Sequence, residues 1–237
     1  FVIIILAALI LPSGHASASP PNDSSAADLQ RQAAQGDADA QNNLGALYFE
    51  GQGGPQNYAM ARQWWERAAA QGHAMAQANL GGLYAYGYGV PQDYAAARQW
   101  SEKAAAQGNA MAQDNLGGLY AKGQGVPQDY TMARQWFDKA AAQGYAMAQY
   151  NLGVLYDQGL GVSQDYLMAR QWFEKAAVQG NAMAQYGLGV LYAKGLGVPQ
   201  DYAIAHQWTE KAAAQGNADA QSNLGGLYAE GQSVPQD

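Results

Sequence analysis

A block of 36 residues returns along this chain without insertion or deletion, and this period limits the fold more than any other feature. The second copy reads AQANLGGLYAYGYGVPQDYAAARQWSEKAAAQGNAM. The alanine that opens each copy stands at Ala40, Ala76, Ala112, Ala148, Ala184 and Ala220. A fixed period of this size is typical of solenoids, because one short unit cannot bury its apolar face and must stack against its neighbours.

Each copy contains two stretches with the apolar spacing of a helix. In the second copy they cover Ala76–Ala85 and Tyr94–Gln107. Gly108 then suits the left-handed residue after a helix, and Asn109 suits the N-cap of the next helix. Asp37, Asn181 and Asn217 repeat this cap, whereas His73 and Tyr145 are not expected to cap. The sequence therefore predicts an all-α fold, an α/α superhelical solenoid of 36-residue helix-hairpin repeats.

A glycine recurs in the middle of each first helix, where it is expected to let neighbouring helices approach closely. These positions are Gly45, Gly81, Gly117, Gly153, Gly189 and Gly225.

The loop between the two helices is rich in glycine and raises the question of phosphate binding. In the second copy it reads GYGVPQDY from Gly87. A phosphate loop would carry the third glycine of G-x-G-x-x-G after a strand, or a Lys followed by Ser or Thr, and neither is present. Gly87 suits the end of the first helix, Gly89 a chain reversal and Asp93 the N-cap of the second helix. The loop is therefore predicted to be a structural connection.

Composition and charge exclude several classes of function. The net charge of −7 provides no basic patch for nucleic acid, and the absence of cysteine removes thiol catalysis and cysteine-based zinc sites. The three histidines, His15, His73 and His206, are far apart in sequence, and no H-E-x-x-H, G-x-S-x-G or S-x-x-K motif occurs. We therefore predict no catalytic residues, no cofactor and no metal.

One position of the second helix is followed four residues later by an acid. His206 replaces the arginine that the other copies carry there, and is predicted to be a solvated substitution. The acids are predicted to form helix-surface ion pairs worth a few tenths of a kcal/mol each. They are Glu66, Glu102, Asp138, Glu174 and Glu210.

Residues 1–18 have a different composition from the repeats. Phe1–Leu11 is continuously apolar, and Ala16-Ser17-Ala18 offers a small-residue cleavage site, which together predict a signal peptide that lacks its basic start. A membrane anchor is the alternative, but about 20 apolar residues are needed to span a bilayer. Residues 19–25 are predicted to be a linker. The mature domain is expected to be exported, periplasmic or secreted, with no membrane insertion.

The repeated residues A-Q-x-N-L-G-x-L-Y-x-x-G-x-G-V-P-Q-D-Y and K-A-A-A-Q-G closely resemble the Sel-1-like repeat family, relatives of the tetratricopeptide repeats. The resemblance covers residues 26–237, with a partial N-terminal cap helix, five full repeats from 37 to 216 and a truncated sixth. It implies a scaffold or adaptor for protein complexes, often in bacterial envelopes. Some cysteine-rich relatives are linked to penicillin binding or β-lactam hydrolysis, which does not carry over to a chain without cysteine.

Two positions of the first helix change from copy to copy, while the core positions hardly vary. The third position is Asn42, Ala78, Asp114, Tyr150, Tyr186 and Ser222, and the seventh is Ala46, Gly82, Gly118, Val154, Val190 and Gly226. A spacing of four places both on one helix face, and resemblance to tetratricopeptide arrays implies that this face lines a concave groove. The candidate partner-binding residues are Asn79, Asn115, Asn151, Asp114, Tyr150 and Tyr186.

The asparagines form a ladder at the fourth position, with Asn43 and Asn223 as further members and a break at Gly187. Their amides can bind the backbone of an extended peptide or can bond within the solenoid; the sequence leaves both open. Likewise Tyr150 and Tyr186 are either rigid anchors for a partner or residues tolerated on a wide helix face.

These observations predict a non-catalytic protein–protein interaction scaffold of the bacterial cell envelope that binds a protein or peptide in its groove. One alternative is a hydrolase acting on β-lactam or cell-wall amides. Another is a carbohydrate-binding scaffold for polysaccharide export, with the tyrosines stacking on sugars. The sequence predicts neither the partner nor the oligomeric state.

Overall fold

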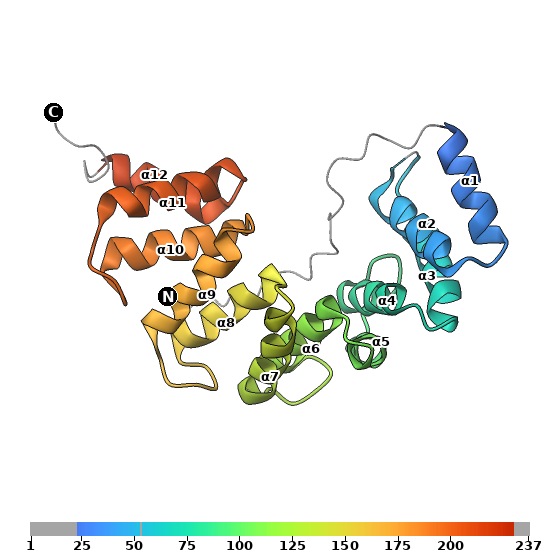
Figure 1. Cartoon of the computed structure of the whole chain (residues 1–237), viewed down its shortest axis with the longest axis horizontal. Coiled ribbons are helices and arrows are strands. Elements are labelled where there is room, and N and C mark those ends of the chain that lie inside the picture. Colours follow the sequence, from blue (N-terminus) through green and yellow to red (C-terminus); the bar gives the residue numbers. More distant parts are fainter. Residues whose placement is uncertain (1–22, 53, 230–237) are drawn as a thin grey trace. The chain divides into compact units, whose positions relative to one another are not determined.

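The computed structural model describes residues 23–52 and 54–229, and within them the chain is helical throughout, without a strand (Figure 1). The first six helices are α1 (Asp23–Ala34), α2 (Ala38–Glu50), α3 (Tyr58–Ala70), α4 (Ala74–Tyr86), α5 (Tyr94–Ala106) and α6 (Ala110–Lys122). The next six are α7 (Tyr130–Ala142), α8 (Ala146–Gln158), α9 (Tyr166–Ala177), α10 (Ala182–Lys194), α11 (Tyr202–Ala214) and α12 (Ala218–Ala229). The all-α, repeated hairpin architecture predicted from the sequence is confirmed.

The signal peptide predicted over residues 1–18 lies outside the described residues, as does the loop of the sixth repeat. Helix α1 begins at Asp23, inside the segment predicted to be a linker over 19–25. Among the described residues, no helix is both long and apolar enough to cross a membrane.

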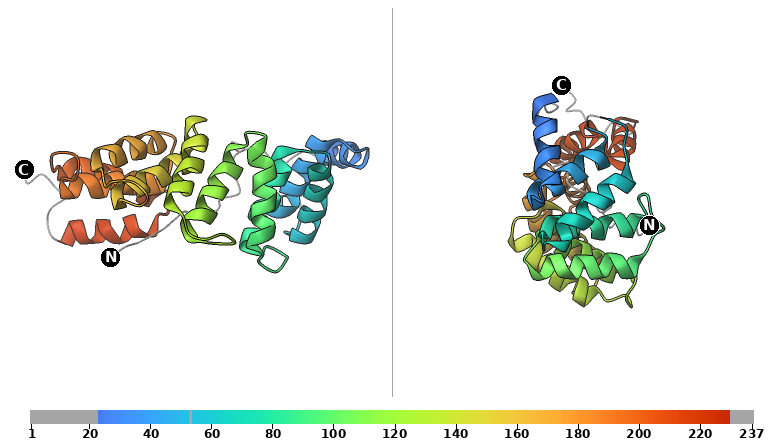
Figure 2. Two further views of the ribbon diagram at one scale, coloured as in Figure 1. Left: turned by 90° about the horizontal axis from the view of Figure 1, so that it is seen from below. Right: turned by 90° about the vertical axis from the view of Figure 1, so that its right-hand side faces the viewer.

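The helices form two compact units, one ending at Gln128 and containing α1–α6, the other starting at Asp129 and containing α7–α12. Within each unit every helix packs on the next one in the chain, so successive hairpins lie side by side (Figures 1 and 2). First helices of adjacent repeats also touch, α4 with α6 and α8 with α10.

The helix ends are fixed by the predicted caps. Asn109 accepts a hydrogen bond from the Ala112 N–H at 2.9 Å, and Gly87 ends α4 with a φ of 71°. Tyr145 makes no side-chain cap bond, as expected. The prediction for His73 is wrong, because its Nδ1 accepts from the Ala76 N–H at 3.1 Å. An imidazole whose Nδ1 is unprotonated is an acceptor like a carboxamide oxygen.

The glycine-rich loop is held by two bonds that close the hairpin. In the second repeat, the Asp93 N–H donates to the Tyr84 carbonyl at 2.9 Å, and the Gln92 side chain donates to the Ala85 carbonyl at 2.7 Å. The equivalent glutamines are Gln56, Gln128, Gln164 and Gln200. Asp93 also caps α5 through the N–H groups of Ala95 and Ala96. These bonds support the structural role predicted for the loop.

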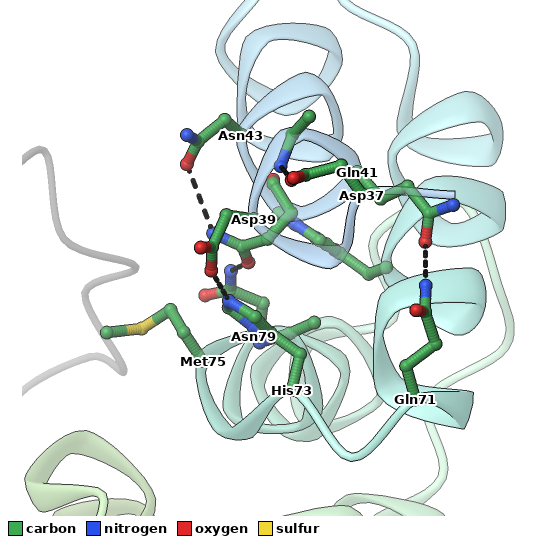
Figure 3. A network of polar contacts seen from close by, with 12 residues as sticks. Asp37, Asp39, Gln41, Asn43, Gln71, His73, Met75 and Asn79 are labelled. Atoms are coloured by element: carbon green, nitrogen blue, oxygen red, sulfur yellow. Dashed lines mark hydrogen bonds and ion pairs between the residues drawn. The ribbon is translucent and has the colours of Figure 1, made fainter. Parts of the chain in front are cut away.

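A ladder of buried glutamines connects the repeats. Gln77 on α4 donates to the Ala69 carbonyl of the preceding hairpin at 3.2 Å and accepts from Gln107, at the end of α5, at 2.8 Å. The pairs Gln41–Gln71, Gln149–Gln179 and Gln185–Gln215 repeat the contact between glutamines, the first of them visible in Figure 3. This ladder explains why the glutamines of A-Q and of K-A-A-A-Q-G recur together.

The mid-helix glycines face the second helix closely, as predicted. A Cβ at Gly45 would lie 2.5 Å from the Trp65 ring, and one at Gly153 would meet the Phe173 ring. The facing residues in successive repeats are Trp65, Ser101, Phe137, Phe173 and Thr209, all buried. Each follows a half-buried tryptophan that carries a Lys or Arg over its ring, such as Lys103 at 4.3 Å from the Trp100 centroid.

Candidate partner-binding face

The candidate face consists of the third and seventh positions of the first helices together with the asparagine ladder, and is called the first-helix face below. The structure divides its predicted residues between the two units: Asn79, Asp114 and Asn115 lie on α4 and α6, and Tyr150, Asn151 and Tyr186 on α8 and α10. Five of the six are buried, with exposed fractions of 4–8%; Tyr186 is half-buried. Most of these side chains therefore present little surface to a partner.

The asparagine ladder makes hydrogen bonds within the solenoid at Asn79 and Asn43. Asn79 Nδ2 donates to Asn42 Oδ1 of the preceding repeat at 3.1 Å, and Asn42 in turn donates to Asn43 at 3.4 Å (Figure 3). Asn115 has Ala78 in place of an Asn42 equivalent, and its buried Nδ2 has no hydrogen-bond partner. The internal role that the sequence left open thus applies to Asn79, with the third position of one repeat supplying its acceptor.

In the first unit, Asp114 is the charged residue of the face. It is 6% exposed and lies near Lys122, two helical turns later on α6. Burial lowers the pKa of Lys122, and the Asp114 carboxylate partly offsets that shift. The pKa of Tyr86 is raised, by burial first and then by the fields of Tyr88, Asp114 and Tyr94. Asp114 and Lys122 therefore partly neutralise each other.

In the second unit, two tyrosines dominate the face. The Tyr150 ring stacks on Phe173 of α9 with centroids 5.8 Å apart. Gly187 leaves room for this pair, because a Cβ there would lie 3.1 Å from the Phe173 ring. A side chain at the ladder position of this repeat would therefore crowd the Phe173 ring. Tyr186 bonds Asn223 of the next repeat, so this asparagine also has a partner within the array.

Burial and two aspartates raise the pKa values of the two tyrosines. Burial raises the pKa of Tyr150 to about 12, with further contributions from Asp157 and Asp219. The pKa of Tyr186 is raised by burial and by Asp219. Burial also raises the pKa of Asp157, although Lys194 opposes the shift. Sequence reasoning missed Asp219 because it stands at a position that is methionine in four other repeats.

Asp39 and His73 make the shorter of two histidine–carboxylate contacts among the described residues, and the pair resembles part of a catalytic dyad (Figure 3). His73 Nε2 lies 2.9 Å from Asp39 Oδ1, while Nδ1 accepts the Ala76 N–H and caps α4. Both ring nitrogens are therefore engaged, and neither is left to abstract a proton. Among the described residues, no group of three or more metal-ligating side chains could hold a metal ion.

The predicted helix-surface ion pairs are present. Arg62, Arg98, Arg134 and Arg170 lie 3.1–3.7 Å from the acid four residues later. His206 pairs with Glu210 at 3.5 Å, but its side chain is only 14% exposed. It is therefore more buried than the solvated substitution that the sequence predicted.

The fold and these contacts define an α/α solenoid of helix hairpins. The Sel1 repeat model matches six consecutive segments, residues 38–73, 74–109, 110–145, 146–181, 182–217 and 218–237. The chain belongs to the Sel1 repeat family, and the resemblance inferred from the sequence is confirmed. Sel1 repeat proteins are generally non-catalytic scaffolds for protein interactions. No curated protein matches the chain.

Solved structures of Sel1 repeat proteins have the same fold. A Sel1 repeat protein from Oxalobacter formigenes is 37% identical with a TM-score of 0.80, over 90% of this chain and 86% of that one. A protective antigen present in uropathogenic Escherichia coli strains is 43% identical with a TM-score of 0.76 over 90% of this chain. This chain spans only 45% of that antigen. An immunity protein from Pseudomonas aeruginosa, 23% identical with a TM-score of 0.61, shares the fold.

Proposed function

We propose that the chain is a non-catalytic interaction scaffold of the bacterial cell envelope, and that it holds a protein or peptide on its first-helix face. The observation that carries the proposal is the contrast between fixed and variable positions. Loop glutamines, ladder glutamines and mid-helix glycines recur in the repeats, whereas the third and seventh positions change from Asn42 and Ala46 to Tyr186 and Val190. Variation on one face of a fixed framework is what recognition of a particular partner requires.

Two further observations support the proposal. The family generally serves protein interactions, and relatives of the same fold include immunity proteins. The signal-peptide pattern of residues 1–18 favours an envelope location.

The proposal is tested by capture of partners from envelope extract with the wild-type chain, Tyr186→Ala and Tyr202→Ala. Tyr186 is half-buried on the first-helix face, whereas Tyr202 is an exposed tyrosine on a second helix and serves as the matched control. We expect specific proteins that Tyr202→Ala retains and Tyr186→Ala loses. Equal capture by both variants would contradict binding on this face. Retention of glycans in place of proteins would favour the carbohydrate-binding alternative.

Tyr150→Ala is a weaker test than the sequence suggests. Its ring packs on Phe173, so truncation removes core contacts as well as any partner contact. The hydrolase alternative is tested separately by incubating the chain with a chromogenic β-lactam and with peptidoglycan. We expect no turnover, since both ring nitrogens of His73 are engaged, Nε2 by Asp39 and Nδ1 by the Ala76 N–H.

A further inference from the structure

In the first unit, the repeat itself indicates where each amide of the asparagine ladder points. Asn79 Nδ2 reaches the third position of the preceding repeat, where Asn42 Oδ1 accepts its hydrogen bond at 3.1 Å (Figure 3). Asn115 stands at the equivalent position one repeat later, and the helices of the two asparagines, α4 and α6, are in contact. By the same register, the Asn115 amide faces Ala78.

Ala78 provides no side-chain acceptor for this amide. The Asn115 side chain is 4% exposed, and its Nδ2 has no hydrogen-bond partner within the described part of the chain. The hairpin framework does not require alanine there, because the first repeat carries Asn42 at the same position. A buried donor without a partner is destabilising, and its usual explanation is a ligand or an ordered water that completes it.

Small residues surround the orphaned amide. The seventh positions of α4 and α6 are Gly82 and Gly118, where the second unit has Val154 and Val190. A Cβ at Gly118 would meet nothing within 4 Å, so the space beside it is open. Gly118 follows Asn115 by three residues and therefore neighbours it on the helix surface. A rotation of the amide toward Gly118 would bring Nδ2 to a place that a ligand's main chain can approach closely.

The charge next to the amide favours a neutral acceptor. Asp114 precedes Asn115 on α6 and is 6% exposed, whereas Lys122 lies two helical turns away at the end of the helix. A carboxylate or phosphate at Asn115 would be placed beside a buried aspartate, and like charges brought together in this way are strongly unfavourable. A peptide carbonyl is a good acceptor that carries no net charge.

We propose that the first-helix face of the first unit binds a backbone carbonyl of an extended partner peptide through Asn115 Nδ2, over Ala78 and Gly118. The inference rests on the proposed function and deepens it, because it assigns main-chain recognition to the first unit. The second unit has Tyr150 and Val154 at the positions of Asp114 and Gly118, so a partner meets bulky side chains there.

The experiment is a titration of the ¹⁵N-labelled chain with N-acetyl-triglycine N-methylamide, a peptide that offers main-chain groups and no side chains. The side-chain NH₂ signals are followed, and Asn79 is the internal control because its Nδ2 is already bonded to Asn42. We expect saturable shifts of the Asn115 NH₂ signals and of the Gly118 amide, without a saturable shift at Asn79. Sodium acetate at the same concentration is expected to give no saturable shift.

Two variants test the assignment to one amide. Ala78→Asn supplies the acceptor that Asn42 gives to Asn79, and Asn115→Ala removes the donor. Each is expected to weaken binding of the triglycine peptide about fivefold, the effect of one neutral hydrogen bond. Far-UV circular dichroism checks that each variant is folded, and either variant alone is a sufficient test.

Absence of a saturable shift at Asn115, an equal shift at Asn79 or unchanged affinity in the variants would overturn the inference. A stronger response to acetate would overturn it in favour of an anion site. A nuclear Overhauser effect from the Asn115 NH₂ group to a long-lived water that the peptide does not displace would assign the amide to a structural water.

These failures are distinguishable from failure of the scaffold proposal. If Tyr186→Ala abolishes partner capture while the triglycine peptide does not bind at Asn115, the scaffold stands and only the main-chain inference falls.

Discussion

The two units carry their aromatic residues in different places. In the first unit, Phe49, Tyr58, Tyr86 and Tyr88 cluster at the hairpin loops with ring centroids 5.1–5.4 Å apart. The first-helix face of that unit has Ala78, Gly82 and Gly118. In the second unit, tyrosine and valine occupy that face, and Leu160 and Leu196 stand in the loops. The same hairpin framework therefore accepts bulk at either location, which leaves the first-helix face free to change.

The largest expected effect on stability comes from replacing Phe173, the residue on which Tyr150 stacks. Phe173 in the second unit and Ser101 in the first occupy equivalent buried positions. Phe173→Ser is expected to reduce the free energy of unfolding by about 3–5 kcal/mol, since it leaves a cavity and removes the support of Tyr150. Urea unfolding followed by circular dichroism measures it.

The matched change at the equivalent position of the first unit is Ser101→Ala. The Ser101 hydroxyl is buried without a hydrogen-bond partner, so its removal is expected to be neutral or stabilising. A large loss of stability in Ser101→Ala would contradict the contrast between a Phe173 ring that supports its neighbours and a Ser101 hydroxyl that makes no stabilising bond.

The second prediction concerns alkaline pH. The Tyr150 pKa is about 12 in the folded chain and 10.0 unperturbed, so between these values the unfolded chain releases a proton that the folded chain keeps. Stability therefore falls as pH rises from 10 to 12, by up to about 3 kcal/mol from this residue. Tyr150→Phe is expected to lose less stability than the wild type over that range. Parallel pH profiles of the melting temperature would contradict it.

The third prediction compares two glycines of the first helices. Gly153→Ala places a Cβ against the Phe173 ring and is expected to cost about 1–3 kcal/mol. Gly118→Ala meets nothing within 4 Å and is expected to stabilise by up to about 1 kcal/mol through helix propensity. Thermal melts of the two variants, compared with the wild type, measure both changes; shifts of the same sign would be inconsistent with these contacts.

The smallest effect concerns the caps. His73 caps α4 in the first unit, whereas Tyr145 provides no side-chain cap for α8 in the second. Tyr145→Asn is expected to stabilise by about 0.5–1 kcal/mol, and His73→Ala to destabilise by a similar amount. His73→Asn is the control that keeps the cap. The urea midpoint should be highest for Tyr145→Asn, near that of the wild type for His73→Asn and lowest for His73→Ala. A destabilised Tyr145→Asn would show that the tyrosine has a packing role that outweighs a cap.

Local features of the fold could be predicted from the sequence, but most surroundings of the candidate site could not. Helix boundaries and the caps at Asn109 and Asp93 depend on residues close together in the chain, which the repeat displays. The burial of Tyr150 depends on Phe173, which belongs to the next helix and replaces the smaller Ser101 of another repeat. Asp219 also raises the pKa of Tyr150 although it stands two repeats further along the chain, and no local pattern indicates this influence. Sequence reasoning located the variable face, whereas the exposure of its residues required the packed structure.

The glutamine ladder has a consequence for how such a chain can change its length. Each ladder amide joins the end of one hairpin to the beginning of the next with identical partners, eight residues back and 30 residues ahead. Gain or loss of a whole 36-residue copy keeps these amides paired, whereas a cut within a helix would separate an amide from its partner and leave it buried and unsatisfied. The glutamine ladder is therefore compatible with duplication and deletion in steps of one repeat, whereas a new residue at the third position must also fit the repeat that follows, as Asn42 does by accepting from Asn79.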